Sequence, residues 1–244
     1  MQAAPSSISF RDPAGSLRIV DGKIFRVVRT EYADAVLEFI NSAFFFRGTA
    51  AGLFPETKVM QEFPPGVSTR ADRAGCILGH DRIPFPVYPH EWLPGMLRDA
   101  GYLTLDLGEE ALAAGWILKD AAASNILYSD GRPVFCDVLS FERKTSSVVW
   151  RAYAQFQRTF VLPLYANRVQ GWSVHSIFME HRDGVDPTML APLVRGLRRI
   201  APMELQTIIW PAKLTNSSAR RRASLIAGLA SPATTDSKLS DFVM

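Results

Sequence analysis

Cysteine is scarce in this chain. Among 244 residues there are only two, Cys76 and Cys136, and each lies within an apolar run. No C-x-x-C pair is present, so the sequence supports neither a zinc site nor a redox motif. Both cysteines are interpreted as small residues of the core, and a chain of this length needs no disulfide to fold.

Long hydrophobic runs are missing as well. No window approaches about 18 uninterrupted apolar residues, so we expect no membrane-spanning helix. The first residues, MQAAPSSISFRDPAG, lack the basic and apolar regions of a secretory signal. These absences predict a cytoplasmic protein without a membrane partner.

An excess of one charge sign is also nearly absent. The chain has 27 Lys and Arg against 24 Asp and Glu, a formal net charge of +3. Part of the excess is local, at Arg220–Arg222 and at three arginines with helical spacing: Arg195, Arg198 and Arg199. These three indicate a solvated helix face. Nucleic-acid binding would need a broader basic surface with interleaved aromatics, and is not expected.

The composition that remains is that of a globular protein, with 48% hydrophobic and 21% charged residues. Two alternating runs in Ser16–Val28 flank Asp21-Gly22, a dipeptide that favours a type I′ turn, and they predict a β-hairpin. Apolar residues at helical spacing predict a helix over Tyr32–Phe45. The run Gly75–Arg82 predicts a strand.

The chain changes character after this strand. Residues 83–90 contain three prolines, which predict an extended connection between two lobes. Apolar periodicity then predicts three helices: Glu91–Trp116, Val148–Phe160 and Pro187–Ile200. Gly115 is the expected stop of the first helix.

This order of elements predicts an α+β protein with two unequal lobes. A small β-rich N-lobe would span residues 1–83, and an extended linker residues 84–90. A mostly helical C-lobe that holds one hairpin would span residues 91–215. From residue 216 the composition becomes Ser, Thr, Ala and Arg with little periodicity, which predicts a mobile tail.

The strongest functional signal is the segment Leu118–Glu142. Two β-type runs flank the turn Ser129–Arg132 and predict a second hairpin. In an antiparallel pair, Asn125 at the start of one strand and Asp137 at the end of the other are neighbours. Asp120 lies one short loop earlier, so three polar side chains are expected to converge.

Phosphoryl transfer uses such a set. One carboxylate orients the acceptor hydroxyl, while an amide oxygen and a second carboxylate hold magnesium against nucleotide phosphates. Asp120 and Asn125 have the D-x-x-x-x-N spacing of kinase catalytic loops. We predict Asp120 as the catalytic residue and Asn125 and Asp137 as metal ligands. On spacing alone, an equally good alternative is that the three residues cap a turn, satisfy a loop and end a strand.

The phrase LKDAAASNILYSDGRPVFCDVLSFE resembles a signature of a bacterial family with a kinase-like fold. The family includes the rhizobial nodulation proteins of NoeA type and N-terminal regions of proteins described as SAM-dependent methyltransferases. Segments upstream, such as HDRIPFPVYPHEW (His80–Trp92), are also similar, and the resemblance covers roughly residues 8 to 165. It implies a two-lobed protein-kinase-like fold of the aminoglycoside-phosphotransferase kind.

The chain also departs from the pattern of active kinases. It has no glycine-rich loop and no V-A-I-K-like strand, and Lys23 and Lys58 lack clear partners. Lys119, which we include with Asn125 and Asp137 as a cofactor-binding residue, stands where kinases carry Arg or Gly. These departures favour a binding module as much as an active phosphotransferase.

A complete methyltransferase site is not expected. The common SAM-binding fold needs a glycine-rich turn after a strand, whereas the glycines of the N-terminal part are scattered. They lie at Gly48, Gly52, Gly66, Gly75 and Gly79. Methyl transfer would therefore need another chain.

Three hypotheses follow for the function. The first is a kinase-like nodulation-type accessory protein, associated with host-specific signal (Nod factor) synthesis or modification, that binds a nucleotide, a small molecule or a partner enzyme. The second is a small-molecule phosphotransferase that uses Mg and ATP. The third is a partner subunit or truncated half of a SAM-dependent methyltransferase. The cofactor is otherwise left open.

Overall fold

The computed structural model describes residues 6–7, 13–67, 73–145 and 150–215. The chain divides into two compact units, residues 1–184 and residues 185–244. The mobile tail predicted from residue 216 lies outside the described residues. Within the described residues, no helix is both long and apolar enough to cross a membrane.

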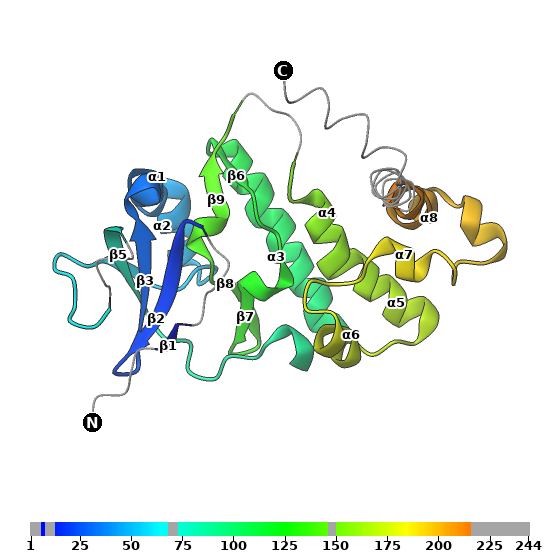
Figure 1. The fold of residues 1–244 in the computed structure, drawn as a ribbon, viewed down its shortest axis with the longest axis horizontal. Helices are drawn as coiled ribbons and strands as arrows, with labels where there is room; N and C mark the ends of the chain where they lie inside the picture. The colour runs from blue at the N-terminus through cyan, green and yellow to red at the C-terminus, as the bar shows by residue number, and fades with distance from the viewer. Residues whose placement is uncertain (1–5, 8–12, 68–72, 146–149, 216–244) are drawn as a thin grey trace, which may run out of the picture. The chain divides into compact units, whose positions relative to one another are not determined.

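The first unit begins with an antiparallel sheet in the order β1-β2-β3-β5-β4 (Figure 1). Its strands are β1 (Ser6–Ser7), β2 (Gly15–Val20), β3 (Lys23–Arg29), β4 (Thr57–Val59) and β5 (Ala74–His80). The predicted hairpin is confirmed as β2 and β3. Asp21 and Gly22 join them with φ angles of 49° and 73°, the positive values that a type I′ turn requires. The strand predicted over Gly75–Arg82 is confirmed as β5.

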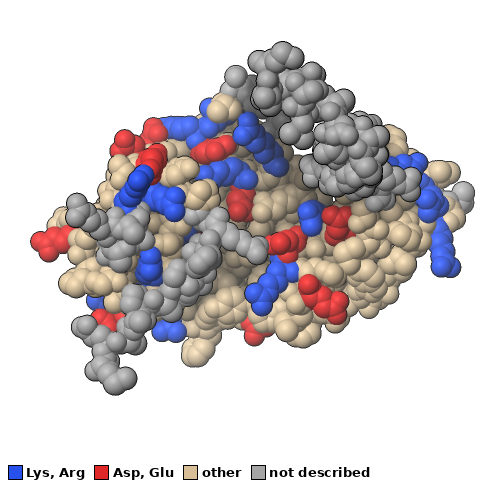
Figure 2. Space-filling view, viewed as in Figure 1, with Lys and Arg blue, Asp and Glu red and all other residues tan. Residues whose placement is uncertain are grey.

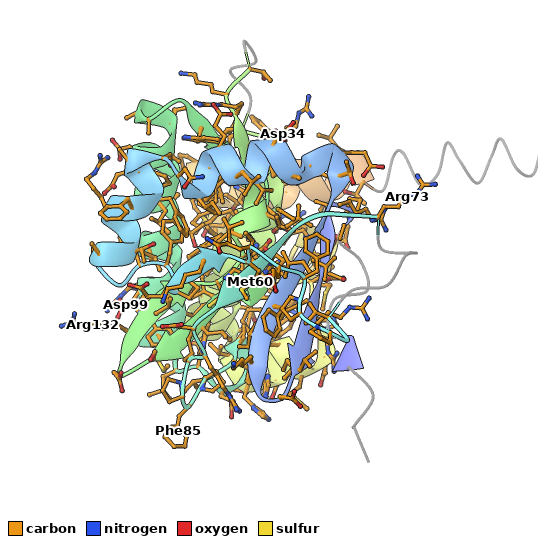
Figure 3. All side chains as sticks on the ribbon, turned by 90° about the vertical axis from the view of Figure 1, so that its left-hand side faces the viewer. Asp34, Met60, Arg73, Phe85, Asp99 and Arg132 are labelled. Atoms are coloured by element: carbon orange, nitrogen blue, oxygen red, sulfur yellow. The ribbon has the colours of Figure 1, made fainter. Side chains whose placement is uncertain are left out.

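The helix predicted over Tyr32–Phe45 is two helices, α1 (Thr30–Ile40) and α2 (Ala43–Ala50). The break occurs because Ser42 is an N-cap, whose hydroxyl accepts a hydrogen bond of 3.2 Å from the backbone N–H of Phe45. In Figure 3, α1, which carries Asp34, lies across one end of the strands.

The connection after β5, which is predicted to be extended, is not extended throughout. Val87 pairs with Tyr128 through two backbone hydrogen bonds of 3.3 Å. Pro89–Glu91 then forms a 3-10 turn, because proline is accepted at the first position of a helical turn. Phe85 projects from this connection and is 90% exposed (Figure 3).

Helix α3 (Pro94–Ala113) confirms the first predicted helix of the second lobe. Its buried residues include Leu97, Ala100, Leu103, Leu107 and Ala111. Gly115 follows with a φ of 84°, the left-handed conformation that commonly ends a helix.

The hairpin predicted within Leu118–Glu142 is also confirmed. Its strands are β7 (Ile126–Ser129) and β8 (Arg132–Phe135), and a second two-stranded sheet frames it, formed by β6 (Trp116–Leu118) and β9 (Phe141–Arg143). Asp130 and Gly131 have φ angles of 50° and 76°, so this turn repeats the chemistry of the first hairpin.

The next helical stretch begins at Tyr153, later than predicted. It runs through α4 (Tyr153–Phe156), a π-helical turn (Gln157–Val161) and α5 (Leu162–Gln170). Pro163 has no N–H for the regular hydrogen bond to Thr159, and a π-helical turn is a common response to such a defect. The unit ends with α6 (Val174–Glu180).

In the second unit the helix predicted over Pro187–Ile200 is wrong. Only α7 (Pro187–Leu190) and a 3-10 turn (Gly196–Ile200) form. Gly196 has a φ of 58°, and the guanidinium of Arg199 donates to the carbonyl of Val194 at 3.1 Å. The backbone reversal at Gly196 therefore separates Arg195 from Arg198 and Arg199, which do not share a helix face. A short helix α8 (Pro202–Glu204) follows.

The predicted α+β class is confirmed, with a β-rich N-terminal part and a helical remainder. The main core of the first unit includes residues from α1, α2, α3 and the hairpin segment, while a smaller cluster holds Phe25, Val27, Val67 and Ile77 on the opposite face of the sheet. Figure 2 shows basic and acidic side chains interspersed on the described part of one face.

Candidate functional site

A cleft of about 810 Å³ lies within the first unit, between the N-terminal sheet and the hairpin segment. All four predicted site residues line it: Lys119, Asp120, Asn125 and Asp137. Apolar side chains form much of the wall, namely Leu17, Ile19, Ile24, Pro55, Ile83, Pro86, Leu127 and Leu139. A cavity of this size and character is typical of small-molecule sites.

The structure brings Asp120 and Asn125 into direct contact. The side-chain amide of Asn125 donates to Oδ1 of Asp120 at 3.0 Å, and the backbone N–H of Ala122 donates to the same oxygen at 3.1 Å. A single 3-10 turn, Ala123–Asn125, closes the loop between the two residues. The D-x-x-x-x-N spacing therefore places its two polar ends on one side of a tight loop.

Asp137 joins this pair through Ser140. The hydroxyl of Ser140 accepts from Asn125 Nδ2 at 3.1 Å and donates to Asp137 Oδ2 at 2.6 Å. Ser140 has no exposed surface, so its hydroxyl holds the two residues in a fixed relation. The backbone N–H of Lys119 completes this link by donating to the carbonyl of Ser140 at 2.8 Å.

The residue that sequence reasoning missed is Arg26. Its Nη1 lies 2.8 Å from Oδ1 of Asp137, and the two side chains are only 9% and 20% exposed. Arg26 lies on β3, on the face opposite Phe25 and Val27, which belong to the smaller core cluster. The sequence contained one sign of this role: Arg26 is a charged residue within the otherwise apolar middle of its strand, on the face opposite Phe25 and Val27.

The predicted loop is fixed from behind by the helical stretch. The backbone N–H of Ala121 donates to Gln155 Oε1 at 2.9 Å, and Thr159 Oγ1 donates to the Ala121 carbonyl at 3.3 Å. The indole N–H of Trp150 donates to the carbonyl of Leu118 at 2.7 Å. Since both ends of the loop are bonded to other elements, Asp120 is held in place before any ligand binds.

His80 adds a half-buried, neutral imidazole to the lining of the cleft, and its Nε2 is fully buried. Its Nδ1 lies 2.9 Å from Thr57 Oγ1, whose own proton is donated to the Pro55 carbonyl at 3.0 Å. His80 Nδ1 is therefore the donor, and Nε2, which has no partner among the described residues, is a bare acceptor. Burial and the positive charge of Arg26 lower the pKa of His80 to about 3, with Asp137 opposing the shift.

Thiol chemistry is not favoured in this cleft. Burial raises the pKa of Cys136 to about 12. The pKa of Cys76 is also raised, mainly by burial and then by the charge of Asp34. Neither sulfur is a thiolate at neutral pH, and the thiolate is the reactive form. Burial of Cys76 confirms its interpretation as a core residue.

The arrangement does not fit the magnesium ion that kinase chemistry implies. Magnesium needs hard oxygen ligands with near-octahedral geometry. One oxygen of Asp137 is engaged by Arg26 and the other by Ser140. Among the described residues, no group of three or more His, Cys, Asp or Glu side chains could hold a metal. The roles predicted for Asp120, Asn125 and Asp137 stay predictions.

The chain matches no family model. It is similar to Nodulation protein NoeA of Rhizobium meliloti (strain 1021), with 28% identity over 211 residues. The match covers 84% of this chain and 44% of the relative, so the chain spans less than half of that protein's length. The predicted resemblance to the NoeA-type family is confirmed, whereas its methyltransferase part stays a prediction.

Proposed function

From the relationship of this chain to NoeA-type nodulation proteins, we propose that it is a kinase-like, nodulation-type accessory protein that binds a small ligand in its cleft. The ligand would carry an apolar ring system and polar groups, as a nucleotide or a small metabolite does. The nodulation role rests on the name of the relative, Nodulation protein NoeA. The association with host-specific signal synthesis or modification is part of this proposal.

The order of elements supports the kinase-like interpretation. Three strands, a helical segment and two further strands precede the connection, and the long helix α3 follows it. Asp120, Asn125 and the hairpin come next. Asp137 follows β8, the second strand of the hairpin, and this is the order of kinase catalytic and metal-binding segments. In kinases the third strand carries the lysine that contacts the phosphates; here β3 carries Arg26.

The observation that carries the proposal is the composition of the cleft. Apolar residues from both the sheet and the hairpin line it, and the polar network of Asp120, Asn125 and Asp137 lies in the same cavity. Apolar walls with a few convergent polar groups bind a ligand by burying its ring and orienting its polar end. A partner enzyme could then be regulated by the occupancy of this cleft.

A thermal-shift experiment with a cleft-filling variant tests the proposal. We expect adenosine, ATP or S-adenosylmethionine to raise the melting temperature of the wild type. A ligand at about 100 times its Kd stabilises by about 2.7 kcal/mol. Ile19→Trp, which fills the cleft from β2, should abolish the shift. Leu105→Trp, at a site 40% exposed on α3, is the control and should keep it.

The result that would contradict the proposal is the absence of any shift, or an equal shift in Ile19→Trp. A shift with S-adenosylmethionine alone would instead favour the third hypothesis, a subunit or truncated half of a methyltransferase. Such a result would also show that the chain binds this cofactor without a glycine-rich turn.

A phosphotransferase is the second candidate, because Asp120, Asn125 and Asp137 lie together. Asp120 would accept the proton of the acceptor hydroxyl, and Lys119 beside it would face the transferred group. The donor set as arranged does not fit magnesium, and we derive no step through the metal. Phosphate transfer that Asp120→Asn abolishes while ligand binding persists would establish this activity.

A further inference from the structure

Arg26 holds an unusual place in the cleft. It contacts Asp137 at 2.8 Å, and its side chain is more than nine-tenths buried. Its Nε is also buried, with no acceptor among the described residues. The guanidinium thus neutralises the carboxylate, while its Nε is enclosed by protein atoms.

A metal ion at Asp137 would have to displace this guanidinium from Oδ1. Arg26 would then be a buried charge without a partner, which is strongly unfavourable. The second oxygen, Oδ2, is held by Ser140 at 2.6 Å, and Ser140 is itself fixed by Asn125 at 3.1 Å. Metal binding would therefore break a connected network.

The charges that line the cleft are balanced. Three cations, from Arg26, Arg82 and Lys119, face three anions, from Asp81, Asp120 and Asp137, and His80 is neutral. A nucleoside triphosphate normally reaches a protein with a divalent cation that offsets its charge. This cleft has no net positive charge, and Asp137 is already paired with Arg26. It therefore does not supply the positive charge that would offset a triphosphate.

We propose that Arg26 is a built-in cation that closes Asp137 to divalent metal ions, so that the cleft binds a ligand of low net charge, such as a nucleoside, without magnesium. The metal exclusion stands on the geometry of Arg26, Ser140 and Asp137. The class of ligand rests on the function proposed above.

Manganese binding, followed by electron paramagnetic resonance of the free ion, tests the metal exclusion on the full chain. We expect no difference between the wild type and Asp137→Asn with millimolar manganese. Arg26→Met should gain a site at least about tenfold tighter than any in the wild type, and the double variant Arg26→Met/Asp137→Asn should lose it. Arg29→Met, on an exposed side chain of the same strand, should behave as the wild type.

Manganese binding by the wild type that Asp137→Asn removes would overturn the metal exclusion, and this comparison does not depend on the folding of Arg26→Met. Failure of a folded Arg26→Met to gain a site would also overturn it.

The ligand class is tested by thermal shifts with adenosine and with ATP, each with magnesium and with EDTA. We expect adenosine to give the larger shift, unchanged by EDTA. A larger shift with magnesium and ATP, lost in EDTA, would overturn this inference and leave the proposed function intact. No shift with any ligand would overturn the proposed function, whereas the manganese result stands independently.

Discussion

The hydroxyl of Ser140 connects two residues of the site that would otherwise not touch. It has no exposed surface, and it is both acceptor for Asn125 and donor to Asp137. Asp137 also contacts Arg26 of β3, and Asn125 donates to Asp120. The Ser140 hydroxyl therefore links β3 to the loop of Asp120 through a continuous chain of polar contacts. A single buried side chain therefore aligns groups from the sheet, the loop and the hairpin.

We predict that Ser140→Ala lowers the free energy of unfolding by about 1–3 kcal/mol, since the variant leaves Asn125 and Asp137 each with one bond fewer in a buried setting. Urea denaturation measures this loss. Ser124→Ala, at an exposed residue that also lines the cleft, should stay within about 0.5 kcal/mol of the wild type. Equal losses in both variants would show that Ser140 does not hold the network.

His80 predicts a loss of stability on acidification. Its folded pKa is about 3, whereas an unfolded histidine titrates near pH 6.5. Between these values the unfolded state binds a proton that the folded state does not, so stability falls as the pH falls through this window. From pH 7 to pH 5 the contribution is roughly 2 kcal/mol.

Urea unfolding at the two pH values measures this contribution. The variant His80→Gln should flatten the dependence by about 1–2 kcal/mol, because it removes the titrating group. His181→Gln, at a side chain that is 36% exposed, should keep the wild-type dependence. An unchanged slope in His80→Gln would contradict a lowered pKa of His80 in the folded protein.

The convergence of the polar residues in the site could be predicted from the sequence, but their ion pair with the sheet could not. Asp120, Asn125 and Asp137 could be predicted to converge because a loop and a hairpin, both local in sequence, bring them together. The ion pair of Arg26 with Asp137 is long-range, and no local rule connects β3 to the end of β8. Strand periodicity alone could have shown that Arg26 lies on the inner face.

At the scale of elements, an aromatic cluster joins α1 and α2 to the hairpin segment. Phe39 of α1 stacks on Phe141 of β9, with ring centroids 4.7 Å apart, and meets the edge of Trp116 at 5.1 Å. Phe44 and Phe54 also contact it, at 6.1 and 6.3 Å. The cluster fixes the β-rich part against the segment that carries Asp120, away from the cleft, which no cluster member lines.

We predict that Phe39→Ala costs about 3–5 kcal/mol of unfolding free energy, because the ring is 1% exposed and touches aromatics from several elements. Chemical denaturation measures the loss. Phe46→Ala, on a side chain 75% exposed in α2, should change stability by less than about 0.5 kcal/mol. A small loss in Phe39→Ala would mean that the cluster does not join the two parts.

Elements that are bounded by characteristic turn residues were predictable from the sequence, whereas elements that depend on tertiary packing were not. Asp21-Gly22 and Asp130-Gly131 set both hairpins. Ser42 interrupts an apolar pattern that continues through Phe44, so periodicity alone merged two helices. In residues 187–200 the apolar periodicity predicted one helix that does not form. Gly196 adopts a positive φ, and the spacing of apolar residues carries no information about that backbone conformation.

At the scale of the whole molecule, the cleft and its support belong to the first unit alone. Every residue that lines the cleft lies between Pro13 and Ser140, and the main core extends no further than Phe178. The second unit has buried residues of its own, among them Leu190, Val194, Ile208 and Ile209.

We predict that a fragment of residues 1–184 folds and keeps the ligand response of the full chain. The boundary follows Gly184, whose φ of 82° places it at a turn, and the helices that brace the loop of Asp120 all precede it. The thermal shift with adenosine should agree with that of the full chain within about a factor of two in Kd, which corresponds to roughly 0.4 kcal/mol. The matched control is a fragment of residues 1–150, which lacks Gln155 and Thr159 and should lose both the cooperative transition and the shift. A folded fragment of residues 1–184 without the ligand response would contradict the placement of the ligand site in the cleft of the first unit.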